Sequence, residues 1–314
     1  MIAPASPATE EKREAAQKAL EELGFWVKVG RSCFLKRGYL AGSDALRAQD
    51  VNSMFADPEV KGIFCLRGGY GGGRILDRLD YELIRKNPKV FVGYSDITVL
   101  HIALNQKSNL VTFHGPMAAS DMAGEFHPFS REHLLRAVLC PQPINTVLNP
   151  ENQEIKSLVG GKAHGQITGG NLALIVSTLG TPYEIETKGK ILFIEDVDEK
   201  PYRIDRMLTQ LLLAGKLQQA CGFIIGDWRN CEADNPEESL TLQEVFQDIL
   251  APLGKPTLYN VKAGHSRPQL TLPLGVEGLI DGDERDSEKR KNPGESSGNP
   301  GMAYPGQAGF SSIP

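Results

Sequence analysis

The chain has 314 residues, and its 34 Lys and Arg against 39 Asp and Glu give a formal net charge of −5 at pH 7. Hydrophobic residues make up 40% and charged residues 23%, which is ordinary for a water-soluble globular protein of about two domains. This mild charge argues against binding of nucleic acid or anionic membranes, and no apolar run approaches the ~20 residues of a membrane span. The first residues, Met1–Pro7, lack the basic and apolar regions of a secretory signal, so we expect a cytoplasmic protein.

The first half of the chain alternates helix-like and strand-like stretches. Helices are predicted over 9–23, 43–55 and 95–105, and strands over 25–29, 62–66, 89–93 and 110–113. The strands are short continuous apolar runs, as expected where both faces of a sheet are covered. This alternation predicts an α/β fold with a parallel sheet.

The second half is separated from the first by a stretch rich in Pro, Asn and Gly. We place a linker at 141–165, between an N-terminal domain over 1–140 and a C-terminal domain over 166–283. In the C-terminal domain we expect strands at 189–194, 222–225 and 256–261 and helices at 202–214 and 241–249. Residues 284–314 are rich in Gly, Pro, Ser and charge, which predicts a disordered tail whose removal leaves activity unchanged.

Cysteine and histidine patterns give no sign of a metal centre or a disulfide framework. The five cysteines are an odd number and include no C-x-x-C pair, and there is no H-E-x-x-H motif. We therefore expect free thiols and neither a metal nor an organic cofactor.

A glycine-rich loop, Arg67–Arg74, directly follows the strand predicted at 62–66. Five glycines in six positions would let the backbone approach a ligand and present N–H groups. The loop matches neither of the usual phosphate-binding patterns, and a flexible turn is the plain alternative.

Ser95 lies where the strand at 89–93 gives way to a helix. A serine on such a turn has the geometry of a nucleophile elbow, and the N–H after it could stabilise an oxyanion. The final glycine of the G-x-S-x-G pattern is missing, and taken alone the residue is better explained as an ordinary helix N-cap.

Two further residues could complete a catalytic set with Ser95. Glu195 ends the strand at 189–194, and His265 lies in a loop after Gly264. A serine nucleophile needs a base, and an imidazole base needs a carboxylate to fix its tautomer. Spacing alone does not show that the three residues meet, and without further support it favours Glu195 as a solvated strand end and His265 as a loop residue. His101 and His114 are weaker candidates.

Sequence blocks across residues 1–280 resemble the serine-type LD-carboxypeptidases, also called muramoyltetrapeptide carboxypeptidases. They are Ala3–Pro7, Arg67–Gly71, Leu79–Tyr81, Asn87–Thr98, Thr112–Pro116, Gly169–Leu172, Leu179–Tyr183, Ile191–Val197, Pro201–Arg206 and Gly264–Gly275. The blocks stand in family order, and Gly-Tyr-Ser-Asp together with Gly-His-x-x-Pro-Gln is highly specific.

The resemblance implies a flavodoxin-like N-terminal domain, a smaller β-rich α/β C-terminal domain and a homodimer. It implies release of the terminal D-Ala from murein tetrapeptides in peptidoglycan recycling, by cleavage of an LD-peptide bond. It makes Ser95 the nucleophile, His265 the general acid and base, and Glu195 the residue that orients His265. The backbone N–H groups of Asp96 and Gly69 would form the oxyanion hole.

Substrate-binding residues are less well defined by the resemblance. Arg67 and Arg203 suit a D-Ala carboxylate, because arginine pairs bidentately with carboxylates, and Tyr70 lies beside Arg67. Loop anchoring and helix-terminal pairing are the alternatives for the two arginines.

Two other functions compete with the carboxypeptidase. A sister group related to microcin-immunity proteins cleaves a peptide-nucleotide antibiotic, but its loop is less rich in glycine than Arg67–Gly71. A catalytically silent peptide-binding homologue is the third possibility. The chain also departs from the family pattern, since only Met1 and Ile2 stand where a first strand is usual, and a closing strand is expected to be missing after Gly278.

Overall fold

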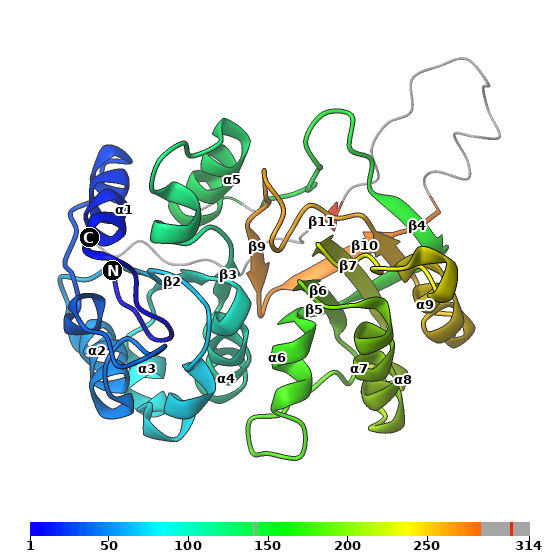
Figure 1. Ribbon diagram of the computed structural model, residues 1–314, viewed down its shortest axis with the longest axis horizontal. Coiled ribbons are helices and arrows are strands. Elements are labelled where there is room, and N and C mark those ends of the chain that lie inside the picture. The colour runs from blue at the N-terminus through cyan, green and yellow to red at the C-terminus, as the bar shows by residue number, and fades with distance from the viewer. Residues whose placement is uncertain (141, 143, 284–301, 304–314) are drawn as a thin grey trace.

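The computed structural model describes residues 1–140, 142, 144–283 and 302–303, and it arranges them as two α/β units side by side (Figure 1). The strands are β1 (Gly62–Phe64), β2 (Val90–Gly93), β3 (Thr112–His114), β4 (Lys156–Val159), β5 (Lys162–Asn171), β6 (Ile191–Val197), β7 (Gly222–Arg229), β8 (Thr257–Tyr259), β9 (Leu272–Leu274), β10 (Glu277–Asp281) and β11 (Met302–Ala303). The α-helices are α1 (Glu10–Glu22), α2 (Asp44–Ala56), α3 (Tyr81–Lys86), α4 (Thr98–Ser108), α5 (Pro128–Leu139), α6 (Leu172–Ser177), α7 (Pro201–Leu213), α8 (Lys216–Gln219) and α9 (Leu242–Ile249). The mixed α/β architecture predicted from the sequence is confirmed.

The N-terminal unit is built on a four-stranded sheet in the order β1-β2-β3-β9. The first three strands are parallel, and β9 runs antiparallel to β3. Successive side chains enter opposite cores: Ile63 and Phe91 pack with α2 and α4, whereas Phe64 and Val92 pack with α1 and the turn 118–122. Burial on both faces explains why these strands are continuously apolar.

The C-terminal unit is built on a seven-stranded sheet in the order β11-β10-β5-β6-β7-β8-β4. Strands β5 to β8 are parallel to one another. On either side of this parallel group, β10 pairs antiparallel with β5 and β4 pairs antiparallel with β8. Helices α6 to α9 cover one face and share a core with Leu192, Ile194 and Phe223. Non-helical chain, including much of 261–276, covers the other face.

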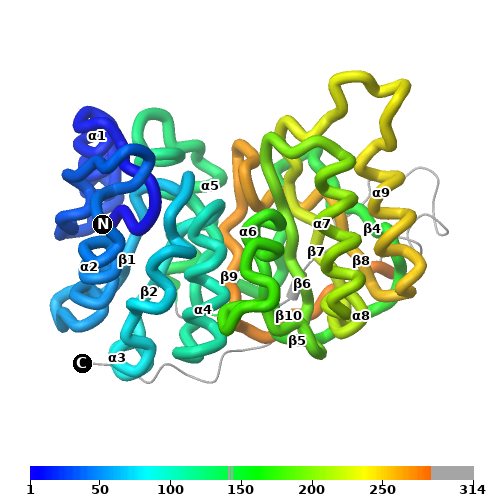
Figure 2. The backbone as a smooth tube through the Cα atoms, turned by 60° about the horizontal axis from the view of Figure 1, so that its bottom comes forward, coloured from blue at the N-terminus to red at the C-terminus, as the bar shows by residue number. Residues whose placement is uncertain are grey.

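The segment 261–276 connects the two units. Leu272 belongs to the same core as Ile191 and Phe193 of β6, yet it also lies in β9, which pairs with β3 of the N-terminal sheet. Figure 2 shows β9 between the two halves of the molecule. The loop that carries His265 is therefore tied to both sheets.

Local sequence signals account for several helix starts. The hydroxyls of Thr9 and Ser43 accept hydrogen bonds from N–H groups in the first turns of α1 and α2. Thr241 and Glu244 form a reciprocal capping box at α9. Each cap satisfies backbone donors that the helix itself leaves unpaired.

Some predicted segments differ from the structure. Residues 25–29 form no sheet strand; the terminal ammonium of Met1 donates to the carbonyl of Lys28 there. The truncation expected for the family's usual first strand is found, because Ile2 forms only a single parallel bridge, with Cys65.

Strands also occur where a linker and a missing closing strand were expected. The stretch 141–165 contains β4 and the start of β5, and β10 follows Val276 and pairs with β5 because apolar residues such as Ile280 are buried there. The tail over 284–314 lies outside the described residues, except for 302–303, which pair with β10 as β11.

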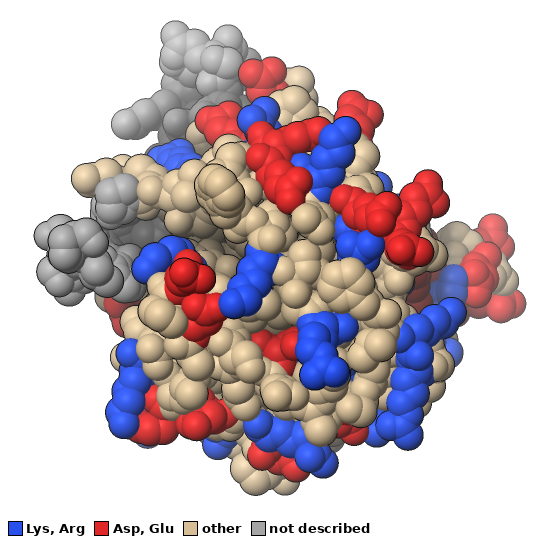
Figure 3. All heavy atoms as spheres, turned by 90° about the vertical axis from the view of Figure 1, so that its left-hand side faces the viewer, with Lys and Arg blue, Asp and Glu red and all other residues tan. Residues whose placement is uncertain are grey.

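The surface carries both signs of charge. Figure 3 shows acidic and basic side chains interspersed over the face at the left of Figure 1, without a large area of one sign. Within the part of the chain that the structure describes, no helix is both long and apolar enough to cross a membrane.

A buried hydrogen bond between the units gives a test of their docking. The backbone N–H of Asn171 donates to the hydroxyl of Thr98 at 2.9 Å. Thr98→Val leaves that N–H buried without a partner, so we expect a loss of about 1–3 kcal/mol in the free energy of unfolding, measured in urea. The control Thr209→Val removes a hydroxyl that donates only to Asp205, and it should cost much less. Equal stability of Thr98→Val and the unmodified protein would contradict this docking contact.

Candidate active site

Ser95 occupies a strained turn between β2 and α4. Its φ is 64°, in the left-handed region that side chains other than glycine rarely adopt, at a cost of about 1–3 kcal/mol. Tyr94 before it is extended, and Ile97 and Thr98 after it are helical. Gly93 must lack a side chain, because a Cβ there would lie 2.9 Å from Cγ2 of Ile97. The turn thus presents Ser95 at the carboxyl edge of the sheet, where ligands bind in open α/β folds.

The glycine-rich loop lies directly against Ser95. A Cβ on Gly68 would meet the Cβ of Ser95 at 2.8 Å and its Oγ at 3.0 Å. Gly69 and Gly71 have φ values of 102° and 132°, which side chains would strain. Among the described residues, the N–H groups of Gly68 and Gly69 find no hydrogen-bond acceptor. These donors are therefore available near the serine.

Asp96 joins the loop to the serine turn. Its Oδ2 accepts the N–H of Gly72 at 2.6 Å, and the side chain is buried. Burial raises the pKa of Asp96 to about 6, although hydrogen bonds from the backbone of Gly72 and Gly71 and the nearby Arg47 favour its ionised form. The carboxylate thus fixes the far end of the loop.

Glu195 and His265 form a buried pair across the second unit. Glu195 ends the apolar part of β6 with a side chain that is 0% exposed, and its Oε2 lies 2.7 Å from Nδ1 of His265. Glycine is required around the pair, because a Cβ on Gly264 would collide with Oε2 of Glu195, and one on Gly226 would lie 3.0 Å from its Cβ. Oε1 of Glu195 has no hydrogen-bond partner among the described residues.

The surroundings of His265 favour its charged form. Burial by itself lowers the pKa of His265, but the charge and hydrogen bond of Glu195 outweigh it, with smaller contributions from Asp196 and Asp121. The net effect raises the pKa of His265 above 6.5. An imidazole so placed readily accepts a proton, because a buried carboxylate stabilises the imidazolium.

Tyr94 brings the serine turn into contact with His265. Its ring meets the imidazole edge-on, with centroids 4.8 Å apart, and its hydroxyl donates to Oδ1 of Asp121 at 3.2 Å. The other oxygen of Asp121 accepts the N–H of Met117 at 2.9 Å. Ser95 therefore lies one residue from a direct contact with His265, although no hydrogen bond joins these two among the described residues.

The histidines considered as weaker candidates are fully buried. His101 donates from Nε2 to the carbonyl of Gly93 at 2.8 Å, and burial lowers its pKa to about 4. His114 packs against Phe193 with ring centroids 4.9 Å apart, and burial lowers its pKa well below 6.5. Both rings are therefore neutral near pH 7, and His101 holds the carbonyl of Gly93 at the start of the serine turn.

The predicted substrate-binding residues are exposed, and their hydrogen bonds and ring contacts among the described residues are with groups other than Glu195 and His265. Arg67 donates to the carbonyl of Pro7, and Arg203 interacts with Tyr202 and Glu199. Tyr70 is 51% exposed, and its ring packs edge-on against that of Tyr39.

The site contains the parts of a nucleophilic acyl-transfer centre. It combines a serine on a strained turn, unpaired N–H donors beside it, and a buried carboxylate that holds an imidazole. Sequence reasoning had singled out these three side chains, but it missed Tyr94 and Asp121. The only sequence signal for Tyr94 was its place beside Ser95. Asp121 lies in an irregular turn after β3 that is visible only in the structure. Across the described residues, no group of three or more His, Cys, Asp and Glu could hold a metal ion.

Comparison with known families covers both units. Residues 1–115 match the model of the LD-carboxypeptidase N-terminal domain, and residues 164–280 match that of the LD-carboxypeptidase C-terminal domain.

Curated relatives match over most of their length. A probable murein peptide carboxypeptidase of Bacillus subtilis is 46% identical over 91% of this chain and 89% of its own. A murein tetrapeptide carboxypeptidase of Pseudomonas aeruginosa is 30% identical over 90% of this chain and 92% of its own.

Solved structures agree with these matches. A muramoyltetrapeptide carboxypeptidase from Oxalobacter formigenes has a TM-score of 0.79 and 28% identity, covering 89% of this chain and 93% of its own. The microcin C7 self-immunity protein MccF has a TM-score of 0.85 and 25% identity, covering 98% and 95%. The identity, coverage and fold together confirm the resemblance seen in the sequence: the chain belongs to the LD-carboxypeptidase family.

Proposed function

We propose that the protein is a serine-type LD-carboxypeptidase that releases the terminal D-Ala from murein tetrapeptides in peptidoglycan recycling. The observation that carries the proposal is the buried Glu195–His265 pair, packed through Tyr94 against the strained turn that presents Ser95. Relatives named murein peptide and murein tetrapeptide carboxypeptidase support the choice of substrate.

In this mechanism the hydroxyl of Ser95 attacks the carbonyl carbon that precedes D-Ala, while Nε2 of His265 takes its proton. Glu195 holds Nδ1–H of His265 and so fixes the tautomer that leaves Nε2 free to act as a base. The N–H groups of Asp96 and Gly69 stabilise the oxyanion. His265 then protonates the amine of the departing D-Ala, and a water molecule activated by the same imidazole releases the acyl group from Ser95.

We propose that an arginine binds the carboxylate of the terminal D-Ala. Arg67 and Arg203 are the candidates, because guanidinium groups bind carboxylates bidentately and both are exposed. Tyr70, half exposed on the glycine-rich loop beside Arg67, is a candidate for contact with the peptide.

We propose the same division of labour between domains as the sequence indicated. The part over 1–140 supplies the nucleophile, the part over 166–283 supplies Glu195 and His265, and 141–165 connects them. The separate sheets of the two units and the family matches over 1–115 and 164–280 support this division. We also propose that the protein works as a cytoplasmic homodimer; sedimentation velocity giving a monomer at micromolar concentration would contradict the dimer.

The first test is D-Ala release from a purified murein tetrapeptide. Ser95→Ala should lower kcat by at least roughly a thousandfold without loss of folding, because removal of a serine nucleophile leaves only the remaining binding and oxyanion interactions. The control is Ser177→Ala, whose hydroxyl lies on the exposed side of α6 and donates to the carbonyl of Leu174. Equal D-Ala release by Ser95→Ala and the unmodified protein would overturn the assignment.

The same assay separates the competing functions. The likeness to MccF, one of whose structures is a complex with glutamyl sulfamoyl guanosine, makes an aminoacyl-nucleotide the appropriate second substrate. We expect cleavage of the tetrapeptide to be far faster than cleavage of that analogue. The reverse preference would favour the antibiotic-cleaving function, and binding of either compound without turnover would favour a silent binding protein.

A second prediction concerns the charge on His265. In the unmodified protein its imidazole should titrate above pH 6.5 in an NMR titration, because Glu195 favours the protonated form. Since His265 must be neutral to act as a base, kcat/KM should fall as the pH drops through that pKa.

Glu195→Gln should shift the titration of His265 to lower pH, because the charge is lost while the burial that opposes protonation remains. The matched control is Glu199→Gln, which changes a partly exposed carboxylate in the connection after β6 that pairs with Arg203 of α7. An unchanged midpoint in Glu195→Gln would show that the pair does not control the protonation of His265.

A further inference from the structure

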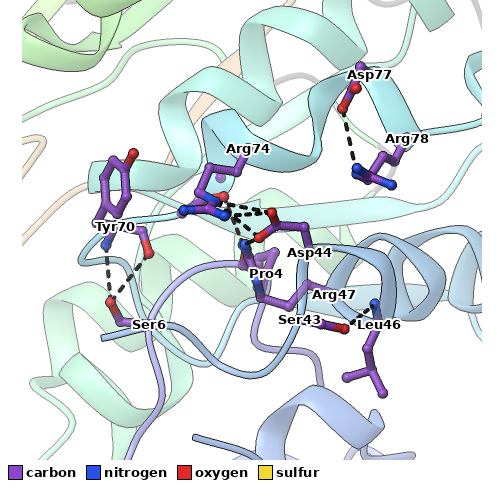
Figure 4. A network of polar contacts seen from close by, with 12 residues as sticks. Pro4, Ser6, Ser43, Asp44, Leu46, Arg47, Tyr70, Arg74, Asp77 and Arg78 are labelled. Carbon is purple, nitrogen blue, oxygen red and sulfur yellow. Dashed lines mark hydrogen bonds and ion pairs between the residues drawn. The ribbon is translucent and has the colours of Figure 1, made fainter. Parts of the chain in front are cut away.

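Helix α2 carries an arginine whose charged group is fully buried. The Arg47 side chain is 0% exposed, and its guanidinium donates to the carbonyl of Gly71 at 2.7 Å, to the carbonyl of Pro4 and to the carboxylate of Asp44 (Figure 4). Within the described part of the chain, Asp44 is the carboxylate that forms an ion pair with Arg47, and Asp44 also pairs with Arg74 toward the surface. Burial of a charge is costly, and a buried ion pair contributes little net stability compared with an apolar replacement. Two of the contacts are backbone carbonyls, which points to a role in fixing chain geometry.

One of the two carbonyls that Arg47 binds, that of Gly71, belongs to the glycine-rich loop beside Ser95. Gly71 has a φ of 132°, and a Cβ there would lie 2.8 Å from Nη1 of Arg47, so the guanidinium rests directly on the glycine backbone. The peptide groups on either side are held as well. The N–H of Tyr70 donates to the hydroxyl of Ser6 at 3.1 Å, and the N–H of Gly72 donates to Asp96 at 2.6 Å.

These contacts fix the loop from Tyr70 to Gly72, and at its start the N–H of Ser6 donates to the carbonyl of Gly68 at 3.2 Å. Figure 4 shows Ser6 and Arg47 approaching the loop backbone from different segments of the chain. Among the described residues, the N–H groups of Gly68 and Gly69 have no acceptor, and Gly68 lies against Ser95. A glycine-rich segment has little intrinsic preference for one backbone geometry, so an external anchor decides where its N–H groups point.

We propose that Arg47 is a positioning residue for the oxyanion hole: by holding the Gly71 carbonyl it keeps the N–H of Gly69, which with the N–H of Asp96 forms the proposed hole, directed toward the serine. The inference rests on the proposed function, since it concerns the transition state of attack by Ser95. Arg47 acts through the loop and touches no reacting atom. Its effect should therefore fall on kcat, because the developing oxyanion gains most from these donors in the transition state.

The test replaces Arg47 by lysine, which keeps the charge but loses the fork that reaches several acceptors at once. We expect kcat for D-Ala release to fall on the order of a hundredfold, with KM changed by less than about threefold. The control Arg78→Lys makes the same change in the segment that follows the loop, where Arg78 is exposed and lies 3.9 Å from Asp77. It should stay within about twofold of the unmodified protein.

A merely structural role for Arg47 predicts a different pattern. In that case Arg47→Lys would lower Tm but leave kcat unchanged when kcat is calculated per serine that still reacts. That result would overturn the proposal. If Arg47→Lys fails to fold, Asp44→Asn supplies the second variant, because Asp44 binds Arg47 and makes no contact with the loop carbonyl. Asp44→Asn should lower kcat in the same direction by a smaller factor, and unchanged kcat there would count against positioning.

A probe of Ser95 that needs no peptide substrate separates this inference from the proposed function. A fluorophosphonate reacts with an activated serine through a transition state whose phosphoryl oxygen occupies the oxyanion hole. Labelling of the unmodified protein without tetrapeptide cleavage would reject the proposed substrate, while slower labelling of Arg47→Lys, by tenfold or more, would still support positioning. Equal labelling rates in folded Arg47→Lys and the unmodified protein would contradict it.

Discussion

The left-handed backbone of Ser95 is the constraint on which the rest of the site depends. At φ 64° the turn costs free energy, and it persists because the packing around it leaves no alternative. Gly93 lets Ile97 close over the end of β2, and Gly68 lets the loop rest on the serine. Glycine is thus needed where the chain passes close to Ser95, and the surrounding cores supply the free energy that maintains the strain.

The second requirement is that two domains meet with fixed geometry. Glu195 and His265 belong to the C-terminal unit, yet the segment after His265 continues into β9, which pairs with β3, the neighbour of the strand β2 that leads to Ser95. Tyr94 adds a ring contact with His265, and Thr98 accepts a hydrogen bond from Asn171. Because these contacts connect the units around the site itself, the catalytic groups depend on no single flexible hinge.

Much of this could be predicted from the sequence, because the informative features are local. Apolar runs marked β1 and β2, capping residues marked α2 and α9, and residue types at strand ends singled out Ser95 and Glu195. The family resemblance supplied the link to His265. Residues 25–29 were mistaken for a strand because they are apolar, whereas in the structure they pack beside α1 without joining the sheet.

What the sequence could not predict depends on contacts between distant segments. The crossing of β9, the Tyr94–Asp121 contact and the burial of Arg47 have no local signature, since they arise only when the units dock.

The most direct test of the account is to identify the covalent intermediate by rapid quenching. The unmodified protein, mixed with murein tetrapeptide and quenched in acid within milliseconds, would be digested and analysed by mass spectrometry. We expect an acyl adduct, which adds the mass of the tripeptide less one water, on the peptide that contains Ser95. An adduct on another residue, or D-Ala release at full rate with the serine never modified, would contradict it.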